Sequence, residues 1–123
     1  MSHLLDTCIL VDLMRQRADA ETAVKKLPQR PCVCAFSAME LYAGARSQRG
    51  EPDVASVLGL FQWTIVDATT FRRAGSLIRH YHPSHGLDIA DALIAAAAQQ
   101  HDLKLVTLVV KNFPMFPKLK PAY

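Results

Sequence analysis

The chain has 123 residues, of which half are hydrophobic and a fifth are charged, and its net charge is +3. This composition excludes a disordered chain and predicts a single folded domain over residues 1–123. The small positive charge is compatible with a nucleic-acid partner but does not by itself indicate one.

The first residues and the cysteines bear on the location of the protein. The opening segment MSHLLDTCILVDLM lacks the basic start and the cleavage site of a secretory signal, and no apolar run approaches the ~20 residues that span a bilayer. The cysteines are odd in number and lie among Val, Ile and Leu, which is typical of buried reduced thiols: Cys8, Cys32 and Cys34. We therefore expect a cytoplasmic protein without a membrane partner.

Short apolar runs alternate with helix-forming segments in the first half of the chain. The first run stops at Asp6, and a later one is followed by Ser37 and Glu40, whose spacing is that of a capping box. Pro52 fits the first turn of another helix. The expected elements are a strand over 2–5, a helix over 8–15, a helix over 18–27, a strand over 31–36, a helix from Ser37 and a helix over 52–60.

The second half continues this alternation. We expect the segment HPSHG to break a long amphipathic helix, and the tail FPMFPKLKPAY to cover the domain and to place one edge strand near Leu119. Strands that alternate with helices predict an α/β layer fold with a central, mainly parallel sheet. The expected elements are a strand over 62–67, a helix over 68–81, a helix over 87–102 and a strand over 103–110.

Three acidic residues follow strands or open helices in this scheme. Asp6 comes after the first strand, Glu40 opens the helix after the second, and Asp91 stands in the first turn of a late helix. In a parallel sheet these positions face one crevice beyond the carboxyl ends of the strands. Carboxylates packed together repel one another unless a cation lies between them, and oxygen ligands suit Mg²⁺ or Mn²⁺. Metal-assisted hydrolysis of a phosphodiester is therefore one option.

Each acid also has a purely structural alternative. Asp88 could cap its helix while Asp91 complements the helix dipole, Glu40 could belong to a capping box, and Asp6 could cap the first helix. A phosphatase with Asp6 as nucleophile is disfavoured, because Cys8 stands where such enzymes carry a second acid. Three histidines near Pro83 could bind a metal, although a polar loop explains them better: His80, His82 and His85.

Four segments, in order along nearly the whole chain, resemble the PIN-domain ribonucleases, in particular toxins of the VapC type. They are LLDTCILVDLM, SAMELYAGARS, HGLDIADALIAAAA and LVTLVVKNFPMFPKL. Each segment alone is a weak signature, but their order and spacing are specific. The resemblance implies an α/β/α sandwich, an acidic Mg²⁺ or Mn²⁺ site, endonucleolytic cleavage of RNA, a homodimer and a cognate antitoxin that blocks the site.

The resemblance also assigns roles to individual residues. The three acids of the family fall on Asp6, Glu40 and Asp91, which would be the catalytic residues and the metal ligands. Asp88 matches an additional position that is often acidic and would have a supporting role. Thr107 matches the threonine that follows the last strand of the family.

Two positions depart from the family pattern. The fourth ligand position, usually Asp or Asn, is Val109, and the position of a family histidine is Asn112. Valine has no lone pair to offer an ion or its water, so metal binding should weaken unless Asn112 compensates as a supporting residue. The alternative is a catalytically weakened or inactive PIN-like module that binds RNA or a protein partner.

An acidic crevice repels a phosphate backbone, so basic residues must flank it for RNA to bind. We expect Arg46, Arg49 and Lys111 to bind RNA, although each could instead be an ordinary surface charge. The other basic residues available are Arg72, Arg73, Arg79, Lys118 and Lys120. We expect Arg46 at the rim, because it lies six residues after Glu40 on the same helix.

Overall fold

The computed structural model describes residues 2–44 and 50–123. Its centre is a four-stranded sheet in the order β3-β2-β1-β4, in which every neighbouring pair of strands is parallel. The predicted parallel sheet is therefore confirmed. The strands are β1 (His3–Leu5), β2 (Cys32–Cys34), β3 (Gln62–Thr64) and β4 (Lys104–Val106).

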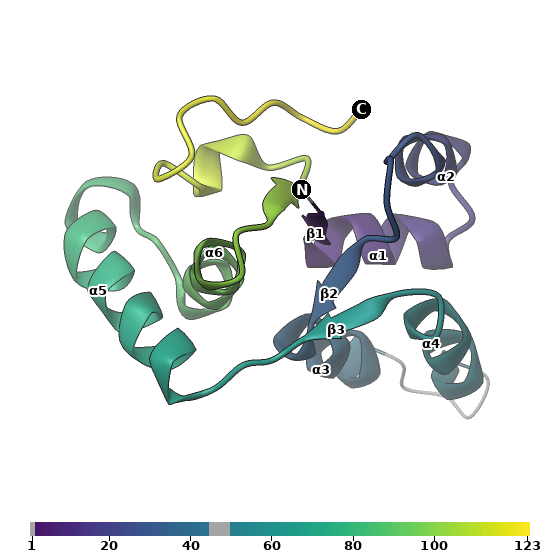
Figure 1. Ribbon diagram of the computed structural model, residues 1–123, viewed down its shortest axis with the longest axis horizontal. Coiled ribbons are helices and arrows are strands. Elements are labelled where there is room, and N and C mark those ends of the chain that lie inside the picture. Colours follow the sequence, from purple (N-terminus) through teal and green to yellow (C-terminus); the bar gives the residue numbers. More distant parts are fainter. Residues whose placement is uncertain (1, 45–49) are drawn as a thin grey trace.

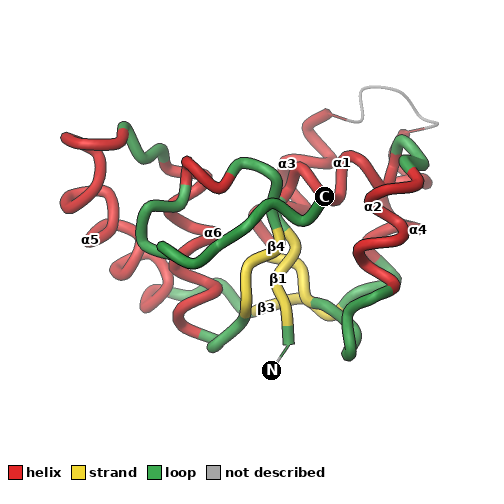
Figure 2. Tube along the Cα trace, turned by 90° about the horizontal axis from the view of Figure 1, so that it is seen from above, coloured by secondary structure: helices red, strands yellow, loops and turns green. Residues whose placement is uncertain are grey.

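Helices cover both faces of the sheet (Figure 1). Figure 2 shows the strands in the middle, with two of the helices, α5 and α6, on one side and the other four on the opposite side. This is the expected α/β/α sandwich. The helices are α1 (Thr7–Met14), α2 (Ala18–Lys25), α3 (Ala35–Gly44), α4 (Gly50–Leu58), α5 (Ala68–His85) and α6 (Ile89–Gln100), followed by a short 3₁₀ helix, η1 (Val110–Asn112).

The core has two halves because side chains of the strands alternate between the two faces. Leu4 packs in the half that contains α6, whereas Leu5 packs in the half that contains α1, α3 and α4, and both are fully buried. Helix α6 is buried from Ala92 to Ala98, and five of these seven residues are alanines whose small side chains let the helix lie close to the sheet. Over the described ranges 2–44 and 50–123, no helix is long and apolar enough to cross a membrane.

Helix α3 begins earlier than expected. The segment 35–36 was predicted to extend the second strand, but the chain passes from Cys34 directly into the helix at Ala35. Ser37 is therefore an interior, buried residue of α3, and the predicted capping box with Glu40 is wrong. The buried hydroxyl of Ser37 meets the side chain of Thr7 instead, at 2.9 Å.

Helix α5 runs on through the segment that was expected to break it. Pro83 lies in its last turn, where the missing N–H disrupts only one helical hydrogen bond. The helix ends at Gly86, whose φ of 63° is the left-handed conformation that glycine adopts most easily. The expected strand ends were also too long, since β3 stops at Thr64 and β4 at Val106.

The segment after η1 forms no strand at Leu119, so that prediction is wrong. Its prolines lack the N–H that a strand would donate. In Figure 1 this segment, drawn in yellow, crosses from the side of α5 and α6 toward α1 and α2. At its far end the N–H of Ala122 donates to the carbonyl of Thr107 at 2.9 Å.

Candidate active site

Asp6 lies at the junction between β1 and α1 and is 4% exposed. Its Oδ1 accepts from the backbone N–H of Thr7 at 2.8 Å, which makes it the N-cap of α1, as the structural alternative predicted. Its Oδ2 accepts from the hydroxyl of Thr107 at 2.7 Å. Each oxygen therefore has a donor, and the carboxylate is held in one orientation at the carboxyl end of β1.

Glu40 lies on α3 and is half-buried. Its Oε1 accepts from the hydroxyl of Thr7 at 2.7 Å, so the residue that follows Asp6 orients the second acid. Sequence reasoning assigned no role to Thr7. The only signal was its place in the LDT segment, directly after a helix-capping acid.

Asp88 and Asp91 lie at the start of α6. The Oδ1 of Asp88 accepts from the backbone N–H of Asp91 at 2.8 Å, so Asp88 caps the helix as its structural alternative predicted. Burial, followed by the charges of Asp88, Asp6 and Glu40, raises the pKa of Asp91 to about 7. A hydrogen bond from Asn112 acts in the opposite direction. The fold therefore brings Asp88, Asp6 and Glu40 near enough to Asp91 for their charges to act on it.

These acids are not arranged as a finished metal site. Over residues 2–44 and 50–123, no three side chains of His, Cys, Asp or Glu are grouped closely enough to hold an ion. Their chemistry fits one, because carboxylate oxygens are the ligands that Mg²⁺ and Mn²⁺ prefer and because burial and the charges of nearby acids disfavour the ionised form of Asp91, which a cation would favour. The catalytic and metal-binding roles of Asp6, Glu40 and Asp91 stay predictions.

Thr107 connects the acidic site to the segment that contains Val109. It is fully buried, and its hydroxyl oxygen accepts from the backbone N–H of Val109 at 3.2 Å while donating to Asp6. Val109 thus contributes through its backbone, although its side chain cannot ligate a metal. Asn112 lies at the end of η1 beside Asp91, and its supporting role stays a prediction.

Cys8 is a further neighbour that sequence reasoning did not place here. Its Sγ lies 3.6 Å from Oδ2 of Asp6 and 3.6 Å from the hydroxyl of Thr107. Burial is the main reason why the pKa of this thiol is raised, so it remains protonated at neutral pH. The half-buried Cys8 and the buried Cys32 and Cys34 are free thiols, as expected.

The predicted RNA-binding residues are only partly described. Arg46 and Arg49 lie outside the described residues, while Lys111 is exposed on η1, one residue before Asn112. The three histidines that were an alternative metal site are on α5 rather than in a loop, and they form no metal-binding group in the part of the chain that the structure describes.

Comparison with known proteins gives a consistent result. The family model described as PIN domain matches residues 3–108. "Ribonuclease VapC19" of Mycobacterium tuberculosis is 39% identical over 127 aligned positions, which cover 98% of each chain.

Two solved structures are similar along nearly their whole length. One is described as a toxin-antitoxin complex from Klebsiella pneumoniae, with a TM-score of 0.85, 30% identity and coverage of 99% of this chain and 98% of that one. The other is VapBC-1 from nontypeable Haemophilus influenzae, with a TM-score of 0.77, 24% identity and the same coverage. The chain therefore belongs to the PIN domain family, and the relatives that it resembles from end to end are of the VapC type.

Proposed function

We propose that this protein is an endoribonuclease toxin that depends on Mg²⁺ or Mn²⁺ and is neutralised by a cognate antitoxin. The observation that supports the proposal is the environment of Asp91, where burial and then the charges of Asp88, Asp6 and Glu40 raise its pKa to about 7. A cation relieves the repulsion between such charges. The names of the relatives, a ribonuclease and a toxin-antitoxin complex, support the same function.

The three acids would hold the ion through their carboxylate oxygens. When bound, it supplies Lewis-acid polarisation of the scissile phosphate and a source of hydroxide at neutral pH. The remaining residues position the acids: Thr107 holds Asp6, and Thr7 holds Glu40. Thr7 uses one lone pair of Oε1 of Glu40, so this carboxylate would keep lone pairs on both oxygens for the ion.

The surroundings of the site suit two macromolecular partners. Exposed Lys111 would contact the phosphates of an RNA substrate, together with Arg46 and Arg49. Exposed apolar side chains adjoin two of the acids in sequence, since Met39 precedes Glu40 and Ile89 follows Asp88. These side chains offer an antitoxin or a second copy of the chain a surface beside the acids. We include a homodimer in the proposal.

The test is cleavage of a mixed RNA pool by the purified chain with Mg²⁺, Mn²⁺ or EDTA. We expect cleavage only with metal, and its loss in Asp91→Asn. A matched control is Asp102→Asn, which removes an exposed acid at a positive-φ position that asparagine tolerates. An Asp91→Asn protein that cleaves RNA as fast as the parent would contradict the site assignment.

The second candidate is a PIN-like binding module, and the observation that favours it is Val109 at the fourth ligand position. A Val109→Asn variant separates the two functions. If the parent cleaves RNA with metal, three acids suffice. If only Val109→Asn cleaves, the site is that of a ribonuclease disabled at one position. If neither cleaves and the parent binds RNA or a protein, the binding module is correct.

A further inference from the structure

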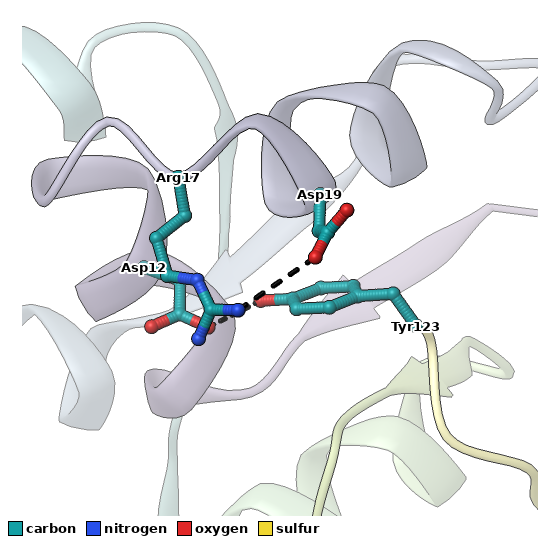
Figure 3. Close-up of polar contacts among 4 residues, drawn as sticks. All are labelled: Asp12, Arg17, Asp19 and Tyr123. Atoms are coloured by element: carbon teal, nitrogen blue, oxygen red, sulfur yellow. Dashed lines mark hydrogen bonds and ion pairs between the residues drawn. The ribbon is translucent and has the colours of Figure 1, made fainter.

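The end of the described chain is attached to α1 by a buried carboxylate that the proposed reaction does not use. Asp12 is 7% exposed, and its Oδ2 accepts from the hydroxyl of Tyr123 at 2.5 Å. Arg17 lies beside both groups, 3.7 Å from Oδ2 of Asp12 and with its guanidinium carbon 6.0 Å from the centre of the Tyr123 ring. Figure 3 shows these side chains together with Asp19, the second acid that Arg17 contacts.

One residue earlier, the same segment is bound to Thr107, the residue that follows β4. The N–H of Ala122 donates to the carbonyl of Thr107 at 2.9 Å, and the hydroxyl of Thr107 donates to Asp6 at 2.7 Å. We refer to the two contacts of the segment, Tyr123–Asp12 and Ala122–Thr107, as the tail clamp. Asp6 and Asp12 belong to one rigid unit, because Asp6 caps the helix that carries Asp12.

The contacts close a ring. It runs from Asp6 along α1 to Asp12, across to Tyr123, back through Ala122 to Thr107, and from the Thr107 hydroxyl to Asp6. One residue before Thr107, the N–H of Asp6 donates to the carbonyl of Val106 at 2.9 Å and holds the end of β4 to the amino terminus of α1. The closed ring adds a second restraint, which acts on Thr107 itself. The phenol can supply its bond across the neutral range, since burial and then Asp12 raise the pKa of Tyr123.

We infer that Tyr123 is a positioning residue for the acidic site: its hydroxyl bond to Asp12 holds Thr107 where the threonine hydroxyl orients Asp6. This inference rests on the proposed ribonuclease function only for its effect on cleavage. The geometric part, which is the placement of Thr107, is independent of what the site does.

Four variants test the inference. Tyr123→Phe removes only the hydroxyl, and Asp12→Leu removes its acceptor. Asp12→Asn removes the charge but keeps an oxygen that can accept the same bond, and is the conservative rescue. Tyr81→Phe makes the same chemical change on α5 and is the matched control.

Two readouts are needed. The first is amide hydrogen exchange. Exchange at Val109 reports on Thr107, whose hydroxyl oxygen accepts from that N–H, and exchange at Ala122 reports on the tail clamp itself. Ala95, in the buried helix α6, is the internal reference. In Tyr123→Phe and Asp12→Leu we expect about 5-fold faster exchange at Val109 and Ala122 relative to Ala95, which corresponds to the loss of an ordinary hydrogen bond. In cleavage assays of the same two variants we expect kcat about 3- to 10-fold lower, with KM for RNA unchanged. This loss is at or below the low end of the effects seen when a residue that hydrogen-bonds to a metal ligand is replaced.

The outcomes separate the inference from the proposed function. Parent-like behaviour of Asp12→Asn and Tyr81→Phe, together with the two expected changes, supports it. Faster exchange at Ala122 with no change at Val109 overturns it, because the tail clamp is then only an anchor. Loss of cleavage in Asp12→Asn equal to that in Tyr123→Phe also overturns it, since charge would then matter rather than the bond. If the parent does not cleave RNA, the proposed function fails while exchange at Val109 still decides the placement of Thr107.

Discussion

Replacing Asp91 by asparagine should stabilise the metal-free protein at neutral and alkaline pH. The pKa of Asp91 is raised from 3.8 to about 7 in the folded chain by burial and by the charges of Asp88, Asp6 and Glu40. Between these two values the folded state binds more protons than the unfolded state, so the free energy of unfolding falls as the pH rises. The destabilisation is complete above pH 7 and absent below about pH 4. Asparagine cannot ionise and therefore does not carry it.

The size of the effect follows from the pKa shift. At about 1.4 kcal/mol for each pKa unit, the full shift would lower the free energy of unfolding by about 4 kcal/mol. Asp91 is only half-buried, so water and salt screen much of the repulsion, and about 1–2 kcal/mol should remain at pH 8. For a chain of this length that corresponds to a rise in Tm of roughly 3–10 °C. The cap of α6 is unaffected, because Asp88 bonds the backbone of residue 91 rather than its side chain.

The assay is thermal unfolding of parent, Asp91→Asn and Asp102→Asn in EDTA from pH 5 to 8.5. The advantage of Asp91→Asn over the parent should grow with pH, while Asp102→Asn follows the parent throughout. Adding Mn²⁺ should raise the Tm of the parent and leave Asp91→Asn nearly unchanged, because a ligand stabilises only the state that binds it. A difference between parent and Asp91→Asn that does not depend on pH would refute the reasoning, as would a less stable variant at pH 8.

Substitutions at three further positions test local features of the structure. Asp88→Ala should lower the free energy of unfolding by about 1 kcal/mol through loss of the helix cap. Asp88→Asn keeps the cap but removes the charge, so it should lower the pKa of Asp91, measured by NMR titration of the Asp91 carboxyl carbon. Thr107→Val should lower the free energy of unfolding, measured in urea, by about 1–3 kcal/mol and weaken Mn²⁺ binding, measured by calorimetry, about 10-fold. Thr107→Ser keeps the hydroxyl and should retain both properties. Equal losses in Thr107→Val and Thr107→Ser would contradict the role of the hydroxyl. Gly86→Ala should lower stability by about 1 kcal/mol, because φ at this residue is 63°, and a neutral result would show that the end of α5 adjusts.

Much of the fold could be predicted because local signals and tertiary contacts agree there. The apolar run before Asp6 becomes β1, and the alanine-rich segment after Asp88 becomes the buried α6. The helix caps at Asp6 and Asp88 were also visible in sequence, since a capping acid acts on residues one to three positions away. The meeting of acids from three different elements followed from one rule about the carboxyl ends of parallel strands.

The failures occur where contacts distant in sequence decide the outcome. Ser37 and Glu40 have the spacing of a capping box, but the contact with Thr7, some 30 positions away, determines where both side chains point. The bond between Tyr123 and Asp12 spans 111 positions, and no local pattern indicates it. The strand that we predicted near Leu119 is absent because the prolines of the last segment disfavour it, and no local pattern indicated what holds this segment in place.

The replacement of the usual Asp or Asn by Val109 removes fewer contacts from the site than the sequence alone suggests. The position still contributes through its backbone, because the N–H of Val109 donates to the hydroxyl oxygen of Thr107 and leaves the proton of that hydroxyl for Asp6. Asn112 lies beside Asp91 and favours its charged form, which is the form that would bind a cation. A side chain lost at the fourth position therefore leaves Asp6 and Glu40 positioned by their own contacts with Thr107 and Thr7. This is why we expect a site weakened in affinity for metal rather than one whose acids have lost their arrangement.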